Sequence, residues 1–253
     1  MGDYETGYQY QDAYGGSALL KDSDMNPRLG FVRKVYAIIF CQLLVTFGLT
    51  AYAMATVEKG GLGWYMNSPQ GKPILWVMMA VYIITMIMVF CCQSVARTVP
   101  TNYITLFIFT LSLSWLVASV CAMFSQAQLQ GLVYEAAAMT AAMTFGLTLY
   151  ACTTKNDITY TGAALFIFSV GFLLMAIFGI FFVRVKWFYT LMVVGIIILY
   201  GFYLVYDTQL IIGGGSYQLS IDDYILGAML IYIDIIILFL RILQLLAILA
   251  GKK

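Results

Sequence analysis

The sequence predicts an all-α integral membrane protein, and three observations lead to that fold class. Only 10% of the 253 residues are charged, whereas a soluble domain carries about 25%. Hydrophobic residues make up 62% of the chain. These residues form continuous runs, not the ten-residue alternating segments of a membrane β-barrel. So few charges cannot cover a water-exposed surface, which excludes a soluble enzyme or a nucleic-acid-binding domain.

The chain divides into a polar tail and an apolar domain. Residues 1–30 contain tyrosine, glycine and acidic residues without an apolar run, so we expect a flexible N-terminal tail and no signal peptide. Residues 31–253 are predicted to form a seven-helix transmembrane domain, because each of seven stretches is close to or above the ~20 residues that cross a bilayer. The stretches are Val35–Val57, Ile74–Cys92, Tyr103–Phe124, Leu129–Cys152, Ile158–Val183, Trp187–Ile212 and Tyr224–Ala250. Glycines and prolines lie between several of them.

The charge pattern bears on orientation and partners. The net charge is +1, which offers no basic field for a polyanion, so we expect the lipid bilayer and no nucleic acid as a partner. Lysines and arginines divide equally between the two sides of a seven-span bundle. The four basic residues before the first span favour a cytoplasmic N-terminus. A cytoplasmic C-terminus would require one segment to be re-entrant, and the sequence leaves that alternative open.

The residue types that are missing exclude several chemistries. The chain has no histidine, which excludes histidine-based pH sensing, histidine-ligated zinc and Ser-His or Cys-His catalysis. Its five cysteines lie in or at the ends of the apolar stretches and imply no disulfide framework. We therefore expect no cofactor.

Four charged residues lie within the apolar stretches: Glu135, Asp207, Asp234 and Arg241. An ionised side chain at the bilayer centre costs about 2.5–3.5 kcal/mol on insertion scales, so such residues are functional candidates. The alternative is that they form hydrogen-bonding pairs that only fix helix packing.

Asp207 and Asp234 are the strongest candidates for a site. They lie on consecutive stretches joined by a short loop, at depths that can coincide, so we expect a close pair. Two carboxylates in a poorly solvated site cannot easily both ionise, and such a pair titrates as a unit. The pair can therefore sense protons without histidine. Carboxylate oxygens also bind Ca²⁺, so Asp207 and Asp234 are candidate Ca²⁺ ligands for which protons would compete.

The remaining charges are assigned by depth alone. Arg241 is seven residues after Asp234, so it shares the same helix face about two turns deeper. Glu135 lies at a comparable depth, which predicts a Glu135–Arg241 pair or near-pair. Arg97 lies just beyond the second stretch, near the level of Asp207.

Four segments resemble one known family. They are Thr154–Thr159 (Thr-Lys-Asn-Asp-Ile-Thr), Tyr206–Ile211 followed by two glycines, Tyr232–Leu240, and the basic Pro-Asn loop Arg97–Asn102. In order and spacing they are similar to the motifs of the Lifeguard branch of the Bax-inhibitor (TMBIM) family, from about residue 30 to the end of the chain. Two departures are Ile237, where the family usually has asparagine, and an N-tail that is short and not Pro-rich.

The resemblance implies both fold and function. It implies seven helices with the last one surrounded by the other six, and no enzymatic activity. It implies a pH-sensitive Ca²⁺ leak through endoplasmic-reticulum or Golgi membranes that lowers store Ca²⁺ and suppresses cell death. Ca²⁺ would be the transported ion, Asp207 and Asp234 the proton-sensing pair near the cytoplasmic side, and Arg97 a latch on Asp207. We expect Glu135 and Arg241 to contribute to the latch or the ion path.

Two other functions stay open at this point. The chain could act without conduction, through contacts with cell-death regulatory proteins, and death suppression would then survive loss of both aspartates. Paired aspartates on neighbouring helices also resemble an intramembrane aspartyl protease. That class needs Gly-x-Gly-Asp at its second aspartate, and Leu230 and Tyr232 occupy those glycine positions.

Overall fold

The computed structural model describes residues 25–58, 60–179, 186–213 and 219–251, and in these ranges every regular element is a helix. Six helices are long and apolar enough to cross a membrane. They are α1 (Met25–Ala55), α3 (Lys72–Cys91), α5 (Thr101–Gln126), α6 (Gln130–Thr153), α8 (Lys186–Ile212) and α9 (Tyr224–Leu249). The predicted helical membrane class is therefore confirmed.

The fifth predicted stretch, Ile158–Val183, is less regular than the others. It contains the short 3-10 helix η1 (Thr159–Thr161) and α7 (Gly162–Gly179), and residues 180–185 lie outside the described residues. A seventh crossing at α7 stays a prediction. Two short helices, α2 (Leu62–Asn67) and α4 (Gln93–Arg97), lie in the connections before and after α3.

The boundary of the predicted tail is too late. Residues 1–24 lie outside the described residues, but residues 25–30 belong to α1. The segment contains Pro27 close to the start of the helix, where a proline is tolerated because the missing N–H has no helical partner there. The start of the helix was predicted too late because the residues before the first apolar run are polar.

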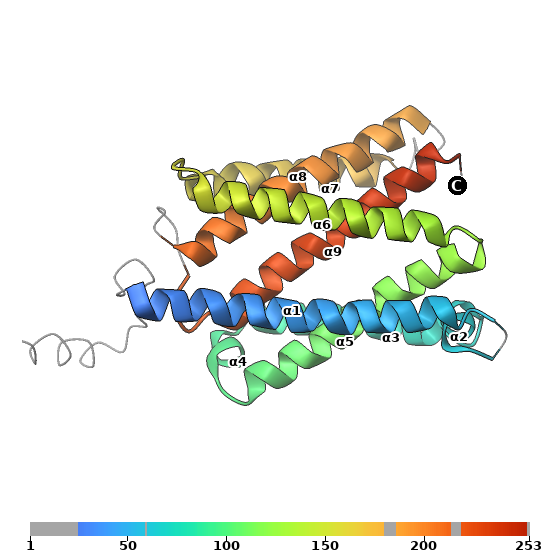
Figure 1. Cartoon of the computed structure of the whole chain (residues 1–253), viewed down its shortest axis with the longest axis horizontal. Coiled ribbons are helices and arrows are strands. Elements are labelled where there is room, and N and C mark those ends of the chain that lie inside the picture. The colour runs from blue at the N-terminus through green and yellow to red at the C-terminus, as the bar shows by residue number, and fades with distance from the viewer. Residues whose placement is uncertain (1–24, 59, 180–185, 214–218, 252–253) are drawn as a thin grey trace, which may run out of the picture.

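The helices form two groups with α9 between them. Figure 1 shows α1, α3 and α5 on one side, α6, α7 and α8 on the other, and α9 crossing obliquely between them. The last helix packs against α1, α5, α6 and α8. Its buried side chains include Tyr232, Leu238 and Leu243, and Phe109 of α5 belongs to the same core. A last helix surrounded by the six other helices of a seven-helix bundle stays a prediction.

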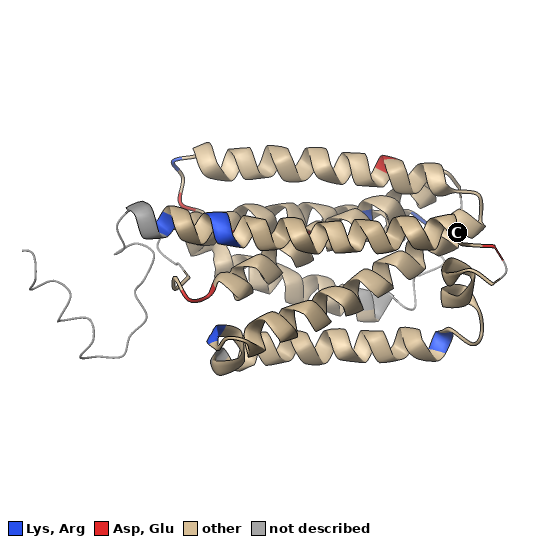
Figure 2. Cartoon of the chain, turned by 60° about the horizontal axis from the view of Figure 1, so that its bottom comes forward, with Lys and Arg blue, Asp and Glu red and all other residues tan. Residues whose placement is uncertain are grey.

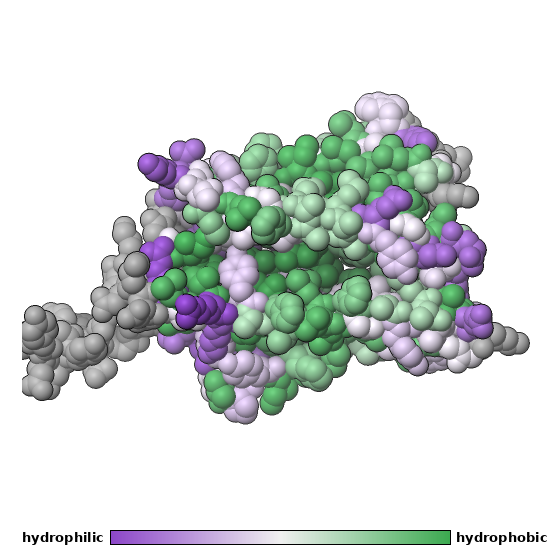
Figure 3. Space-filling model, viewed as in Figure 1, coloured by the Kyte–Doolittle hydropathy of each residue, from purple (hydrophilic) through white to green (hydrophobic). Residues whose placement is uncertain are grey.

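The outer surface is apolar around the middle of the bundle. Large hydrophobic side chains such as Phe47, Trp76, Phe145 and Phe166 are more than half exposed. Figure 3 shows hydrophobic residues across the middle of this face and hydrophilic ones toward its two ends. Charged residues gather near the same ends in Figure 2. Such an apolar surface is suited to the hydrocarbon core of a membrane and not to water.

Candidate functional site: a buried carboxyl pair and an ion pair at one end of the bundle

The first polar centre is made by two aspartates on α8 and α9. Asp207 lies near the end of α8 and Asp234 in α9, and each is only 4% exposed. The two side chains interact directly with each other. The structure therefore brings together the two acids that the sequence analysis places on consecutive helices.

The contacts of this pair restrict its protonation. Asp234 Oδ2 is enclosed and receives no N–H or alcohol hydrogen bond from the part of the chain that the structure describes. A hydrogen bond between two carboxyl groups needs one proton, because an ionised carboxylate only accepts. One shared proton would therefore let the pair join α8 to α9 by a hydrogen bond. Deprotonation would leave two charges of the same sign in an enclosed site.

As a metal site the pair is incomplete. No cluster of three or more histidine, cysteine, aspartate or glutamate side chains occurs within the described residues. Ca²⁺ takes six to eight oxygen ligands, so Asp207 and Asp234 could supply only part of a coordination shell. Carbonyl groups or water would have to supply the rest, which suits brief contact with a passing ion better than a resident metal.

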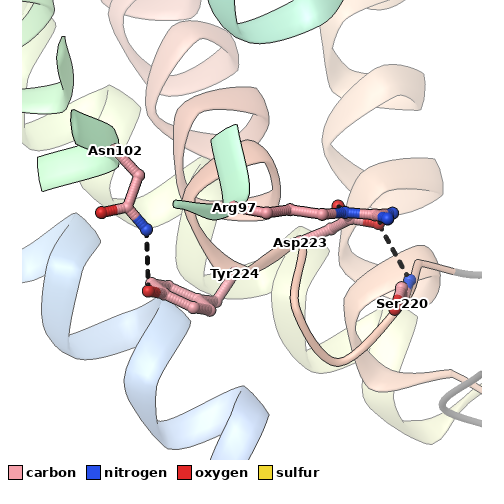
Figure 4. Close-up of polar contacts among 5 residues, drawn as sticks. All are labelled: Arg97, Asn102, Ser220, Asp223 and Tyr224. Carbon is pink, nitrogen blue, oxygen red and sulfur yellow. Dashed lines mark hydrogen bonds and ion pairs between the residues drawn. The ribbon is translucent and has the colours of Figure 1, made fainter. Parts of the chain in front are cut away.

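The second polar centre is an ion pair that joins α4 to the start of α9 (Figure 4). Arg97 Nε donates to Asp223 Oδ1 at 2.7 Å, and Nη2 donates to Oδ2 at 2.9 Å. The backbone N–H of Ser220 donates to Asp223 Oδ2 at 3.2 Å. The hydrogen bond to Asp223 raises the pKa of Arg97 above its ordinary value, although partial burial opposes this. Arg97 is thus a permanently charged group that fixes the start of α9.

The predicted partner of Arg97 is therefore wrong. Its guanidinium binds Asp223 in a bidentate contact instead of latching onto Asp207. The position of Arg97 just beyond the second predicted stretch did not show whether its partner is an acid inside α8 or one in the loop before α9. Sequence reasoning missed Asp223, and the signal that could have found it is the acidic pair Asp222-Asp223 directly before the last apolar stretch.

Further contacts tie the same end of the bundle together. Asn102 Nδ2 donates to the Tyr224 hydroxyl at 2.9 Å (Figure 4). Lys34 Nζ of α1 lies 3.2 Å from the centre of the Tyr224 ring, a cation–π contact. Helices α1, α5 and α9 are therefore held together immediately beside the Arg97–Asp223 ion pair.

Gln209 connects two of the segments that carry the family resemblance. Its Oε1 accepts from the backbone N–H of Ile158 at 2.8 Å, and its Nε2 donates to the Asn156 carbonyl at 2.9 Å. Asp157 in turn accepts from Thr159 N at 2.9 Å and from Thr159 Oγ1 at 2.6 Å. The loop before η1 is thereby bound to the end of α8, two residues beyond Asp207.

The predicted Glu135–Arg241 pair is not formed. Arg241 Nη1 donates to Gln244 Oε1 at 2.7 Å, while Glu135 is exposed. Helix α6 buries Val133, Ala136 and Thr140 on one face. At about 100° per residue, Glu135 points away from that face. Comparable depth is a condition for pairing, but the direction of the Glu135 side chain decides against it.

Comparisons with known proteins agree with the helical membrane architecture. A family model described as "Inhibitor of apoptosis-promoting Bax1" matches residues 28–251. The chain is 31% identical to Protein lifeguard 3 of Homo sapiens over 225 residues, which are 88% of this chain and 70% of that protein. It is 32% identical to Protein LIFEGUARD 4 of Arabidopsis thaliana over 247 residues, with 95% and 93% covered. Protein lifeguard 4 of Mus musculus is 31% identical over 250 residues, with 96% and 97% covered.

Proposed function

Because the chain belongs to the Bax-inhibitor family, we propose that it is a pH-sensitive Ca²⁺ leak channel of endomembranes that lowers store Ca²⁺ and suppresses cell death. It is an integral membrane protein of a family whose description names the inhibition of apoptosis-promoting Bax. The family description supports the cell-death role. The carboxyl pair of Asp207 and Asp234 supports the leak and its control by pH.

The observation that carries the proposal is the direct contact between the enclosed side chains of Asp207 and Asp234. While the pair shares a proton, it joins α8 to α9. When rising pH removes that proton, two like charges face each other in a site that water screens poorly, and their repulsion favours separation of the helices. The same two carboxylates then attract a divalent cation. The shared proton therefore holds α8 and α9 together and keeps the channel closed.

A flux assay tests this proposal. Purified full-length protein is placed in liposomes, and Ca²⁺ efflux is followed between about pH 5 and 8, the range in which an enclosed carboxyl pair can titrate. We expect efflux to rise with pH in the unmodified protein. In Asp207→Asn the amide can still donate to Asp234 but cannot lose its proton, so the pH dependence should be lost. Asp222→Asn, at an exposed aspartate outside the pair, is the matched control.

Two results would contradict this proposal: one refutes the leak itself, the other the carboxyl pair as its pH sensor. The first is the absence of Ca²⁺ efflux at every pH in this range. The second is an unchanged pH dependence in Asp207→Asn and Asp234→Asn. If efflux were absent at every pH and both variants suppressed cell death normally, the function would be that of a non-conducting regulator acting on cell-death proteins. Residence in the endoplasmic reticulum or Golgi, with a cytoplasmic N-terminus, is part of the same proposal.

A further inference from the structure

A large cavity lies between helices at the end of the bundle opposite to the Arg97–Asp223 ion pair. It has a volume of about 1010 Å³ and is lined by residues of α5, α7, α8 and α9. Its walls are mostly apolar and include Phe172, Leu240 and Leu243. The start of α8 and the end of α9, which contribute to it, lie close to the C-terminus in Figure 1. Cavities that enclose small-molecule ligands have volumes of about 300–1,000 Å³, so this one can hold a large ligand.

The charges of this cavity have one sign. Arg241 and Lys186 line it, and no described aspartate or glutamate does so. Arg241 Nη1 donates to Gln244 Oε1, and the Gln244 side chain donates in turn to the Tyr189 hydroxyl. Within the described ranges, Arg97–Asp223 is the salt bridge of this protein, so Arg241 has no carboxylate partner there. A guanidinium carries five N–H donors, which leaves most of those of Arg241 available to a ligand.

The position of Arg241 makes an unpaired charge costly. It lies eight residues before the end of α9, about 12 Å along the helix, and therefore inside the apolar part of a span whose half-thickness is about 15 Å. A charged side chain at such depth requires a partner or water. Lys186 is the first residue of α8 and lies near the membrane surface. The two cations thus mark a path from the surface into an apolar space.

We propose that this cavity binds an anionic lipid, whose phosphate or carboxylate headgroup accepts hydrogen bonds from Arg241 and Lys186 while an acyl chain lies against Phe172, Leu240 and Leu243. Basic pockets between transmembrane helices bind lipid headgroups in this way. A zwitterionic lipid would bring a second, positive charge toward the two cations and is disfavoured. The site requires only membrane insertion, so it does not rest on the proposed Ca²⁺ leak.

Lipid retention measures this binding directly. Full-length protein in detergent micelles is titrated with dioleoylphosphatidate, dioleoylphosphatidylcholine or inorganic phosphate, and bound lipid is detected by native mass spectrometry alongside thermal unfolding. We expect selective retention and stabilisation with phosphatidate. Arg241→Gln should weaken phosphatidate binding about ten-fold or more, the effect of losing a charge-assisted hydrogen bond. Arg241→Lys, which keeps the charge, should lose less.

Two further variants keep the test decisive. Lys72→Gln removes an exposed cation at the start of α3, on the same side of the membrane but outside the cavity lining, and should bind phosphatidate normally. Ala247→Phe fills part of the cavity without changing its charge and should weaken binding if Arg241→Gln fails to fold. Equal retention of phosphatidylcholine, normal binding by Ala247→Phe, or equal stabilisation by inorganic phosphate would overturn the lipid site. These readouts involve no Ca²⁺ flux, so the leak and the lipid site can fail separately.

Discussion

Replacing Arg97 by glutamine removes the ion pair that joins α4 to the start of α9, and its cost can be worked out from the contact geometry. Both hydrogen bonds are short, at 2.7 and 2.9 Å, and a hydrogen bond to a charged group contributes about 1.5–3 kcal/mol. The side chains are partly accessible, at 30% for Arg97 and 12% for Asp223, and solvent screens such a pair. We therefore expect a coupling energy of about 2 kcal/mol, between an exposed pair and a buried one.

A double-mutant cycle measures this energy. The free energy of unfolding is determined in mixed detergent micelles for the unmodified protein, Arg97→Gln, Asp223→Asn and the double variant. Arg97→Gln alone should destabilise most, because Asp223 then keeps its charge in a largely enclosed position. Arg33→Gln, at an exposed arginine of α1, serves as the control and should change the unfolding free energy by less than about 0.5 kcal/mol. A coupling energy below about 0.5 kcal/mol would refute the structural role of the ion pair.

Two more substitutions test contacts that hold the helices together. Gln209→Ala removes both hydrogen bonds to the loop at residues 156–158 and should accelerate hydrogen exchange at the Ile158 amide about ten-fold or more; unchanged exchange would contradict the contact. Tyr232→Phe removes a buried hydroxyl that lies 2.7 Å from Thr46 Oγ1 and should lower the unfolding free energy by about 1 kcal/mol. Tyr160→Phe, at a tyrosine that is 67% exposed, should leave that energy unchanged.

The helical membrane class and the proximity of Asp207 and Asp234 follow from properties that a linear sequence contains. Continuous apolar runs determine which segments can span a bilayer. A short connection places residues of consecutive helices at similar depth, because the rise per residue is constant. For these reasons the aspartate pair was predictable from spacing before any contact was known.

The partners of the other charges were not predictable on the same grounds. A sequence defines the depth of Glu135 and Arg97, but the side to which each points depends on how the helices rotate and pack. The buried face of α6, which contains Ala136, turns Glu135 outward. The ion pair of Arg97 joins residues 126 positions apart. Asp223 and Asp207 are both acids near the same end of the bundle, and only the packing of the helices decides which of them Arg97 binds.

The two polar centres must act differently when pH changes. Arg97 has a pKa above its ordinary value because Asp223 accepts its hydrogen bonds, so its contribution to stability is complete below that ordinary value and is lost only in strongly alkaline solution. Between about pH 5 and 8 the arginine therefore stays charged, and its own titration cannot open or close the channel.

Asp234 follows Asp223 by eleven residues, about 16 Å along the helix. At that separation a unit charge contributes about 1 kcal/mol at an effective dielectric constant of about 20, or ~0.7 of a pH unit. Arg97→Gln should accordingly move the midpoint of a pH-dependent leak by less than about one pH unit, whereas Asp207→Asn removes the dependence itself. If Arg97→Gln abolished it instead, the ion pair and not the carboxyl pair would be the sensor.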